Sequence, residues 1–596
     1  MKHFKLIAVL LFSLFGAASA QQLTYERMST VAYEDMSDWI RRLPGLYPMD
    51  YGVVGAPVLF RPWNAQPWLI GVERDGIPWH RVSDGLYDSN LDSPEGVKSL
   101  SLRFDGTSPF GTLDLRSRML PSDSTTTEVV LREGYYGFGR IDFAQAQQLS
   151  KSVSAEARGR LFWYDGLRLG ISKSRFYNMS GRIIAQLSDQ WRGSLEYGGT
   201  DVDAQAPVAF RVDNIFQRPQ VYSEREYATA KLNRMGQSFR WEFGLHARQD
   251  RETRGSYFGL REKFWYGYAQ GDFSKNKSTF GTRAAVELSD FSFPGIDQRS
   301  ENALSLKVNA GHDLGILKAD LRGLYRQRID VKSRIENQDV YPDESIWLKL
   351  ESKRVAGLSV QTESNFGYKS VPQFWRYAKY PLAYRELPVD ERFFGSSYYG
   401  GTLTAFEPRH EINKVGMMAG GINLNRGTSN ATIKFTRIAY DKHSFTSSGD
   451  TLDYFPENEF LSVWHGVSLD CDVALTSSFR LQSWTSVETD EHDFTRALDT
   501  RAFTRLLISR DFFKAPLHIT SYVAHEMIGK HDAVSDYASY DVGPTHMLHF
   551  RVEGTIEGVT LIWGAENLTG QHYEYLPGYV LISKEEYFGL RWTFKL

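Results

Sequence analysis

The chain has 596 residues, a formal net charge of −3 and a single cysteine. A charge balance this close to zero provides no basic footprint for nucleic acid. One cysteine excludes an intramolecular disulfide framework and any metal site built from several cysteines.

The first twenty residues have the three parts of an export signal. Met1–Lys5 is short and basic, Leu6–Gly16 is apolar but too short to span a bilayer, and Ala18–Ala20 matches a cleavage site. We therefore predict a signal peptide over residues 1–20, followed by a periplasmic segment over 21–33. A retained membrane anchor is the alternative, although no stop-transfer pattern follows the apolar stretch.

Residues 34–122 have the composition of a small mixed domain. This region is rich in Gly, Pro and Trp, and its apolar stretches are short. A short helix is expected over Met36–Leu43, and short strands are expected over Trp68–Val72 and Leu100–Arg103. We predict a small α+β domain.

Residues 123–596 repeat one pattern. Apolar and polar residues alternate within each segment, and short turns and longer loops alternate between the segments. In Val153–Trp163 and Trp191–Tyr197, every second residue is apolar or small and most of the others are polar or charged. A period of two gives a strand one apolar face and one polar face. A secreted array of β-sandwiches is the alternative for any single strand. The unbroken run of strands over several hundred residues favours one closed sheet.

The final segment indicates what the apolar faces meet. Large apolar residues alternate there with polar residues or glycine: Phe588, Leu590, Trp592, Phe594 and Leu596. An aromatic face suits lipid, and a polar opposite face suits a wet lumen. We predict an all-β membrane protein, with a large antiparallel transmembrane barrel of about 20–22 strands in the outer membrane of a Gram-negative bacterium. Because a barrel of this width leaks unless it is filled, the 34–122 domain is predicted to be a plug in the lumen.

Several motifs resemble those of TonB-dependent outer-membrane receptors. Asp35–Gly45 is similar to the start of that family's plug domain, where a short helix ends in a Leu-Pro-Gly turn. Trp68–Pro78 resembles the plug strand that finishes in an Asp-Gly-x-Pro turn, and Val97–Gly111 resembles a later plug element. Ala565–Phe594 is similar to the family's closing hairpin. Their order along the chain identifies a divergent member with a short plug.

The resemblance implies a function and a partner. Members take up a scarce solute, such as a siderophore, vitamin, peptide or saccharide, by displacing the plug with energy from the inner-membrane TonB complex. TonB pairs with an extended segment near the receptor's N-terminus, and the candidate contact here is Met28, Ser29, Thr30 and Val31. The chain departs from the family at Phe60–Trp63, where members usually carry Arg-Gly in the central plug strand.

Solute contacts are expected on the plug and on the long predicted loop over 371–411. Aromatic rings interleaved with arginines can stack on and pair with an anionic chelate or a sugar. The alternative is that Trp63 and Trp79 pack the plug against the barrel wall and that the loop is an ordinary folded surface loop. The candidate residues are Arg61, Trp63, Trp79 and His80 in the plug, and Trp375, Arg376, Tyr384 and Arg385 in the loop.

No sequence pattern indicates catalysis. His525–His531 has the wrong spacing for a zinc-protease helix, and His546 and His549 would point to opposite faces of a strand. We expect no enzyme activity, metal or cofactor, and a monomer that contacts lipid, a small solute and TonB. Two alternatives stay open: a passive porin-like channel with a vestigial plug, and a surface enzyme or adhesin built on a barrel.

Overall fold

The structure is a computed structural model. It describes residues 22–31, 33, 35–49, 58–63, 67–104, 108–121, 123–166, 173–205, 220–254, 258–293, 296–330, 342–370, 412–442, 445–448, 451–454, 460–490, 500–512, 516–535, 538–576, 579–580 and 585–595.

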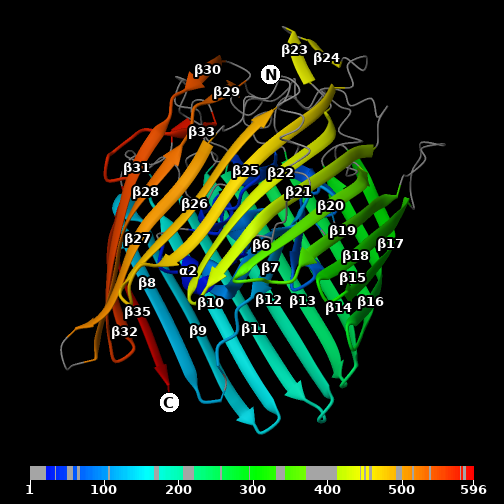
Figure 1. Ribbon diagram of the computed structural model, residues 1–596, viewed down its shortest axis with the longest axis horizontal. Coiled ribbons are helices and arrows are strands. Elements are labelled where there is room, and N and C mark those ends of the chain that lie inside the picture. The colour runs from blue at the N-terminus through cyan, green and yellow to red at the C-terminus, as the bar shows by residue number, and fades with distance from the viewer. Residues whose placement is uncertain are drawn as a thin grey trace.

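Twenty-two antiparallel strands form one closed barrel (Figure 1), which confirms the predicted fold class. The last barrel strand pairs with the first, so the sheet has no open edge. The barrel strands are β8 Thr126–Gly134, β9 Gly139–Ser150, β10 Val153–Tyr164, β11 Ser174–Gln186, β12 Trp191–Gln205, β13 Gln220–Met235, β14 Phe239–Arg254, β15 Phe258–Lys275, β16 Ser278–Phe293, β17 Ile296–Asp313, β18 Leu317–Asp330, β19 Asp343–Ser352, β20 Leu358–Ser370, β21 Ile412–Arg426, β22 Ser429–Lys442, β25 Phe460–Ala474, β26 Phe479–Asp490, β27 Thr500–Phe512, β28 Leu517–Ile528, β31 Thr545–Ile556, β32 Val559–Glu566 and β35 Glu585–Lys595.

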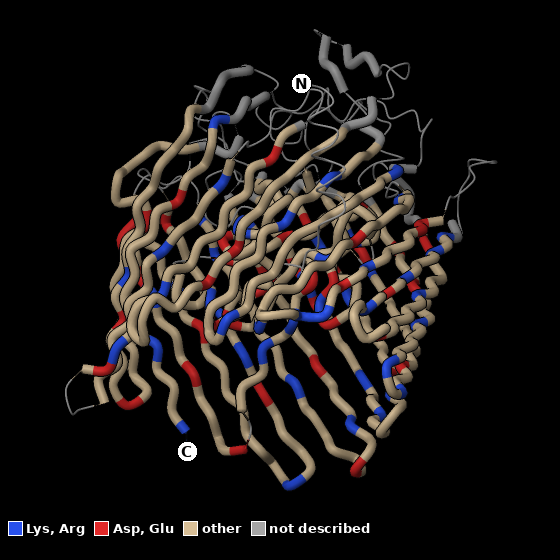
Figure 2. The backbone as a smooth tube through the Cα atoms, in the orientation of Figure 1, with Lys and Arg blue, Asp and Glu red and all other residues tan. Residues whose placement is uncertain are grey.

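Alternation along each strand decides which side chains face outward. Leu245, Phe588 and Trp592 are 69%, 59% and 46% exposed, whereas the Arg248 and Glu262 side chains are fully buried inside. Figure 2 shows charged residues distributed along the strands all round the wall. An apolar outer face and a charged inner face fit a barrel wall between lipid and a polar interior.

The connections differ at the two ends of the barrel. At one end they are short: residues 557–558, for example, form a two-residue turn with Glu557 at φ 48° and Gly558 at φ 84°. Positive φ at both positions gives the turn the twist that antiparallel strands need. At the opposite end, more residues separate β12 from β13, β18 from β19 and β20 from β21. The predicted loop over 371–411 lies outside the described residues.

Among the described residues after 122, three small hairpins lie outside the barrel sheet, and a 3-10 turn joins the first two barrel strands. The hairpins pair β23 Phe445–Ser448 with β24 Thr451–Tyr454, β29 His531–Ser535 with β30 Ala538–Val542, and β33 Glu574–Leu576 with β34 Tyr579–Val580. The turn is η4 Tyr135–Gly137. Among the described residues, no helix combines the length and apolar character needed to cross a bilayer.

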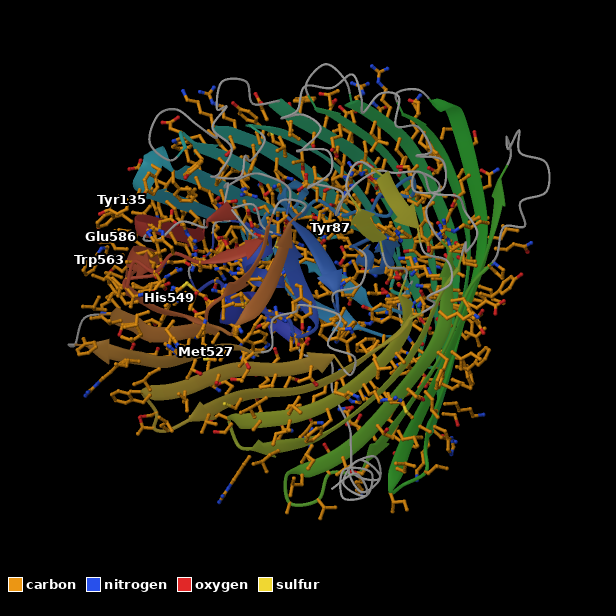
Figure 3. All side chains as sticks on the ribbon, turned by 90° about the horizontal axis from the view of Figure 1, so that it is seen from above. Tyr87, Tyr135, Met527, His549, Trp563 and Glu586 are labelled. Atoms are coloured by element: carbon orange, nitrogen blue, oxygen red, sulfur yellow. The ribbon has the colours of Figure 1, made fainter. Side chains whose placement is uncertain are left out.

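A small α+β domain fills the lumen. Seen from above, the barrel encircles the early part of the chain, with Tyr87 inside the ring and Trp563 at its wall (Figure 3). One buried apolar cluster includes Trp39 and Leu100 of this plug together with wall residues such as Tyr440. The predicted lumenal plug is therefore confirmed.

The plug is built on a five-stranded sheet in the order β1-β6-β7-β4-β5. Asp75 and Gly76, at φ 50° and 77°, form the tight turn between β4 and β5. A second pair, β2 and β3, stands apart from the sheet. The elements are β1 Gln22–Thr24, α2 Tyr25–Met28, α3 Ser37–Ile40, β2 Leu46–Met49, β3 Leu59–Pro62, η1 Pro67–Leu69, β4 Gly71–Arg74, β5 Ile77–Pro78, η2 Ser89–Leu91, η3 Pro94–Gly96, β6 Val97–Arg103 and β7 Thr112–Ser117.

The described part of the N-terminal segment is folded with the plug. Gln22, Leu23 and Thr24 pair with β6 as an edge strand, and α2 follows directly, with the Thr24 side chain accepting a hydrogen bond from the Arg27 backbone N–H. The segment therefore lies between the plug sheet and the barrel wall.

Candidate functional site: the plug and its contacts with the barrel wall

Buried ion pairs fix the plug to the wall formed by β13, β14 and β15. Arg81 of the plug pairs with Glu252 of β14. Glu262 of β15 accepts hydrogen bonds from the backbone N–H groups of Val82 and Ser83, at 3.0 and 2.8 Å. Each wall group here is buried, so removal of one partner would leave a charge without compensation.

Arg248 joins the wall charges to the plug backbone. Its guanidinium lies 2.7 Å from Asp250 and 2.9 Å from Glu262. It also donates hydrogen bonds to the carbonyl oxygens of Pro78 and His80, at 3.3 and 3.0 Å. One side chain therefore holds two wall carboxylates and one plug segment together.

Trp79 and His80, two of the predicted solute contacts, lie at this ionic wall. Trp79 is 2% exposed, donates its indole N–H to Asp92 at 2.7 Å, and stacks edge-on against Tyr227 at 5.0 Å. His80 Nδ1 lies 3.2 Å from the Val72 backbone nitrogen. Burial, followed by the nearby Lys369, holds the pKa of His80 well below its usual value. Trp79 thus packs the plug against the wall, the alternative that the sequence left open.

A second anchor surrounds Glu95 in η3, near the strands that close the barrel. The hydroxyls of Tyr25 and Tyr33 both donate to its carboxylate. Arg140 of β9 lies 3.7 Å from the same carboxylate. Burial would raise the pKa of Glu95, but the arginines around it, first Arg591 of β35, lower it below its usual range. Glu95 is therefore an ionised hub that ties the N-terminal segment to the plug.

Lys307 of β17 makes a further contact of this kind. Its ammonium group lies 2.7 Å from the Glu73 carboxylate of β4. Burial alone would raise the pKa of Glu73, but Lys307 and nearby arginines lower it to about 2. The Glu73 carboxylate is therefore ionised at neutral pH.

Trp63 lies far from Trp79, at the wall formed by β22. Its φ is 44°, its backbone N–H donates to the Gly45 carbonyl at 2.8 Å, and its carbonyl accepts a hydrogen bond from Tyr440 at 3.2 Å. The indole covers Gly45, where a Cβ would lie 2.5 Å from the ring. Gly45 therefore has both a positive φ and no room for a side chain.

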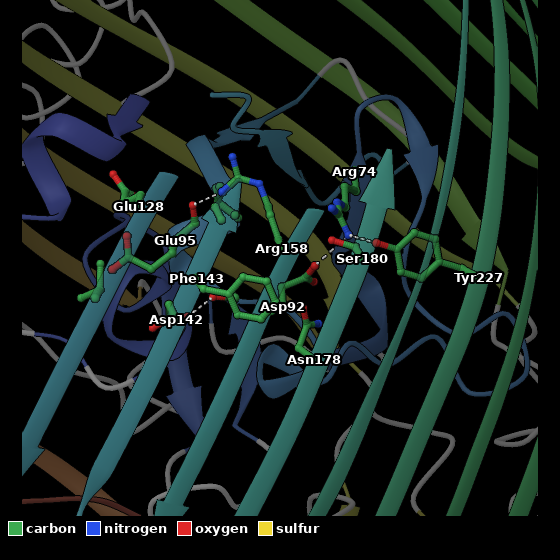
Figure 4. Close-up of a pocket in the computed structure, with 16 residues that line it drawn as sticks. Arg74, Asp92, Glu95, Glu128, Asp142, Phe143, Arg158, Asn178, Ser180 and Tyr227 are labelled. Atoms are coloured by element: carbon green, nitrogen blue, oxygen red, sulfur yellow. Dashed lines mark hydrogen bonds and ion pairs between the residues drawn. The ribbon is translucent and has the colours of Figure 1, made fainter. Parts of the chain in front are cut away.

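The space around Asp92 and Glu95 is too small for a solute. This cavity, shown in Figure 4, has a volume of about 30 Å³ and is lined by Arg74, Arg158 and Tyr227 among others. A volume of ~30 Å³ corresponds to roughly one or two water molecules. Dashed contacts in Figure 4 join Arg74 to Asp92 and Arg158 to the Glu95 backbone carbonyl, so both arginines already have partners in the protein.

Five of the predicted solute contacts fall outside what the structure describes. Trp375, Arg376, Tyr384 and Arg385 lie outside the described residues, and so does the side chain of Arg61, whose backbone is in β3.

The candidate TonB segment is buried in the structure. Met28 and Val31 are 2% and 3% exposed. Arg505 of β27 donates to the Thr30 hydroxyl at 3.1 Å, and Arg551 of β31 donates to the Val31 carbonyl at 3.0 Å. Pairing of this segment with another strand would require its release from the wall.

The wall charges that hold the plug were not singled out from the sequence. Arg248, Asp250 and Glu252 occupy alternate positions of β14, so all three face the lumen. That spacing of mixed charges is a signal that could have found them. Their plug partners carry no such signal, because Arg81 and Glu252 are 171 residues apart.

The described residues contain no group of three or more His, Cys, Asp or Glu side chains arranged to hold a metal ion. The geometry is instead that of a mechanical closure: a small domain held in a wide barrel by charge pairs and hydrogen bonds.

Comparison with known proteins identifies the fold. No protein-family model matches the chain, and neither does any curated protein sequence. Among solved structures, the siderophore receptor PirA from Pseudomonas aeruginosa superposes with a TM-score of 0.72 at 13% identity, over 97% of this chain and 99% of that one. A mutant of the ferric enterobactin receptor PfeA from Pseudomonas aeruginosa gives 0.75 at 11% identity, over 97% and 98%. The copper transporter OprC gives 0.77 at 10% identity, over 96% and 99%.

At identities this low, the likeness establishes the architecture. The match covers almost the whole of both chains, so the plug and the barrel are shared together. The TonB-dependent receptor fold expected from the sequence is confirmed.

Proposed function

We propose that the protein is an outer-membrane receptor of a Gram-negative bacterium that binds a scarce solute outside the cell and admits it by displacement of the plug, with energy from TonB. One observation carries this proposal: a 22-stranded barrel with an apolar outer face has its lumen filled by a separate folded domain. The neighbours of the same fold include receptors for siderophores and a copper transporter.

The contacts of the plug support an energised mechanism. Removing one partner of a buried ion pair costs about 3–5 kcal/mol, and the plug makes such pairs through Arg81, Glu73 and Glu95. The cost of losing several pairs at once is therefore far above thermal energy, so the plug does not leave the wall spontaneously. Displacement therefore requires work, which TonB would perform by pulling on the N-terminal segment.

The TonB contact at Met28–Val31 is retained as a proposal with one added condition. Strand addition needs free backbone N–H and C=O groups, and the Val31 carbonyl is occupied by Arg551. TonB would therefore capture this segment after solute binding has loosened it from β27 and β31.

Solute contacts are proposed mainly for the long loop, at Trp375, Arg376, Tyr384 and Arg385, together with Arg61. Trp63 and Trp79 are buried and His80 is half-buried against the Val72 backbone. The Trp79 and His80 side chains would meet a solute only after the plug has moved. The protein would act as a monomer, without catalysis or cofactor, and the candidate solutes are siderophores, vitamins, peptides and saccharides.

The test is planar-bilayer conductance of the purified protein, intact and with residues 34–122 deleted. We expect the intact protein to be silent and the deletion variant to form a large, steady pore. The variant Arg240→Ala, at the short-turn end of β14, serves as a control, because the Arg240 side chain is 48% exposed and its described ion pair is with Glu242 on the same strand. If the intact protein already conducts and the deletion changes little, the protein is a passive porin.

A further inference from the structure

A cavity of about 460 Å³ lies between the plug and the wall formed by β22, β25 and β26. This volume is within the range of ~300–1,000 Å³ typical of small-molecule sites, and it far exceeds the water-sized space beside Glu95. We call it the inner chamber. It follows the wall from Asp472 to the level of Glu488, whose register partner is Gly466. Six residues along a strand correspond to about 20 Å.

The two sides of the inner chamber differ in chemistry. The plug side is largely apolar and includes Leu43, Pro44, Trp63, Leu102 and Phe104. The barrel side presents hydroxyl and amide groups: Asn430, Thr432, Thr436, Ser468 and Ser486. Such a site orients a ligand that has an apolar or ring face and a hydrogen-bonding edge.

The charges around the inner chamber are already paired within the protein. Lys434 lies 3.1 Å from Glu363, and Asp472 pairs with Arg480. Arg27 and Asp470 form a two-pronged pair at 3.2 and 3.0 Å. A charged solute would find no free counter-ion among these groups and would lose hydration on entry.

Arg27 and Asp470 stand where the inner chamber meets solvent. Both side chains are about one-fifth exposed, at 20% and 18%. Gln22 and Asn430, which also line the chamber, are exposed. Asp470 and Asn430 lie close to the short-turn ends of β25 and β22. This lower closure is thus a single ion pair between α2 and the wall.

The other end is closed by buried groups. Glu488 accepts hydrogen bonds from the Tyr47 hydroxyl and from the Gly45 backbone N–H, the latter at 3.3 Å. Tyr440 donates to the Trp63 carbonyl beside them. Glu488 lies two residues from the end of β26 nearest the long loops. This upper closure is made by the turn before β2 and by β2 itself.

Both closures depend on one short stretch of chain. Arg27, Gly45 and Tyr47 lie within 21 residues of each other, and their partners Asp470 and Glu488 are on the neighbouring strands β25 and β26. We propose that the inner chamber is a second solute site, which holds an uncharged, hydroxyl-bearing solute of about disaccharide size between an upper closure at Glu488 and a lower closure at Arg27–Asp470. The proposal rests on the receptor function above and adds to it a location and a solute class.

The experiment opens the two closures separately and together in the full-length protein. Planar-bilayer conductance in KCl is measured for Arg27→Glu, for Glu488→Ala and for the double variant. We expect each single variant to stay near the silent background, because the other closure holds. The double variant should conduct at least tenfold above background and well below the 34–122 deletion.

A charge exchange separates opening from unfolding. Addition of Asp470→Arg to the double variant restores an opposite-charge pair at the lower closure and should silence the current again. The matched control combines Glu488→Ala with Arg251→Glu, which breaks the exposed outer-wall pair of Arg251 and Glu224 at 3.2 Å. This control should stay silent.

The solute class is tested on the current of the double variant. Sucrose is the uncharged probe, and citrate at equal osmolality is the anionic probe. We expect sucrose to reduce the current at millimolar concentration and citrate to leave it unchanged. Equal block by citrate, or no block by sucrose, would overturn the assigned class.

Two outcomes distinguish this proposal from the receptor function. If the double variant is silent while the 34–122 deletion conducts, the inner chamber is not a solute site and the plugged barrel stands. If the deletion is silent as well, the plug assignment itself fails. A double variant that still conducts after the charge exchange would contradict the lower closure.

Discussion

The plug meets the barrel differently on its two sides. Against β13, β14 and β15, charged side chains interlock: Arg81 with Glu252, and Arg248 with Asp250 and Glu262. Against β22, β25 and β26, the plug contacts the wall at the two closures, and a chamber of about 460 Å³ lies between them. One side therefore anchors the plug, and the other leaves space beside it. A domain held in this way can move on one side without losing its place in the barrel.

The strongest test of this difference removes an anchor. Arg248→Ala would leave Asp250 and Glu262 buried without their shared cation and remove the donor to the His80 carbonyl. We expect the plug to lose about 3–5 kcal/mol of stability, measured by calorimetry of the purified protein in detergent. Arg240→Ala, at an exposed ion pair, should cost less than about 1 kcal/mol. Equal effects would mean that the β13–β15 wall is no special anchor.

The second test uses pH at the anchored side. Burial raises the pKa of Asp88 to about 6 from 3.8, with Glu252 contributing to the rise. Because the folded-state pKa is raised, the stabilising contribution of Asp88 is complete below pH 3.8 and is lost as the pH rises through about 6. The gap corresponds to about 3 kcal/mol. Asp88→Asn should therefore stabilise the plug by up to about this amount at pH 8, and by nothing measurable below pH 4.

Asp75→Asn is the matched control for this pH experiment. Burial would raise the pKa of Asp75, but Lys231 and Arg74 lower it. The sign is therefore opposite: Asp75→Asn should destabilise the plug at neutral pH, and the effect should disappear as the pH falls through the lowered pKa. Melting temperatures of both variants from about pH 2 to about pH 8 provide the comparison. A shift of the same sign in both would contradict the assignment.

The smallest expected effect compares two tryptophans. Trp79→Phe at the anchored side leaves the buried Asp92 carboxylate without the indole donor at 2.7 Å, and should cost about 1–3 kcal/mol. Trp63→Phe at the inner chamber keeps the backbone bonds to Gly45 and Tyr440, so a smaller loss is expected. Thermal unfolding followed by near-UV circular dichroism measures both. A larger loss for Trp63→Phe would reverse the comparison.

The sequence was enough to predict the architecture because the signal is repeated. Apolar and polar residues alternate along the barrel strands, from Val129 and Leu131 in β8 to Phe588 and Trp592 in β35. A wrong assignment of one strand therefore does not change the predicted fold class. The range of 20–22 strands includes the observed 22. The plug turns at Gly45 and Asp75–Gly76 were also visible, since positive φ leaves a mark in residue type.

The site was much less predictable, for a physical reason. Asp470 lies on a polar strand face like many others, and only the folded structure brings Arg27 to within 3.2 Å of it across 443 residues. The strand Gln22–Thr24 is too short to show a period, so its pairing with β6 left no pattern. Trp79 was predicted as a solute contact from its residue type alone. In the structure its indole binds Asp92 and packs against Tyr227, and it does not face open space.

The hub at Glu95 has a consequence for how the protein is assembled. Arg132 in β8 donates to the Tyr33 carbonyl at 2.9 Å, and Arg591 in β35 contributes to the field on Glu95. β8 and β35 are the strands whose pairing closes the barrel. Arg132 and Arg591 therefore lie on the two strands that close the barrel and also interact with the plug and its N-terminal segment. We expect the plug to be in place when the last strand pairs with the first.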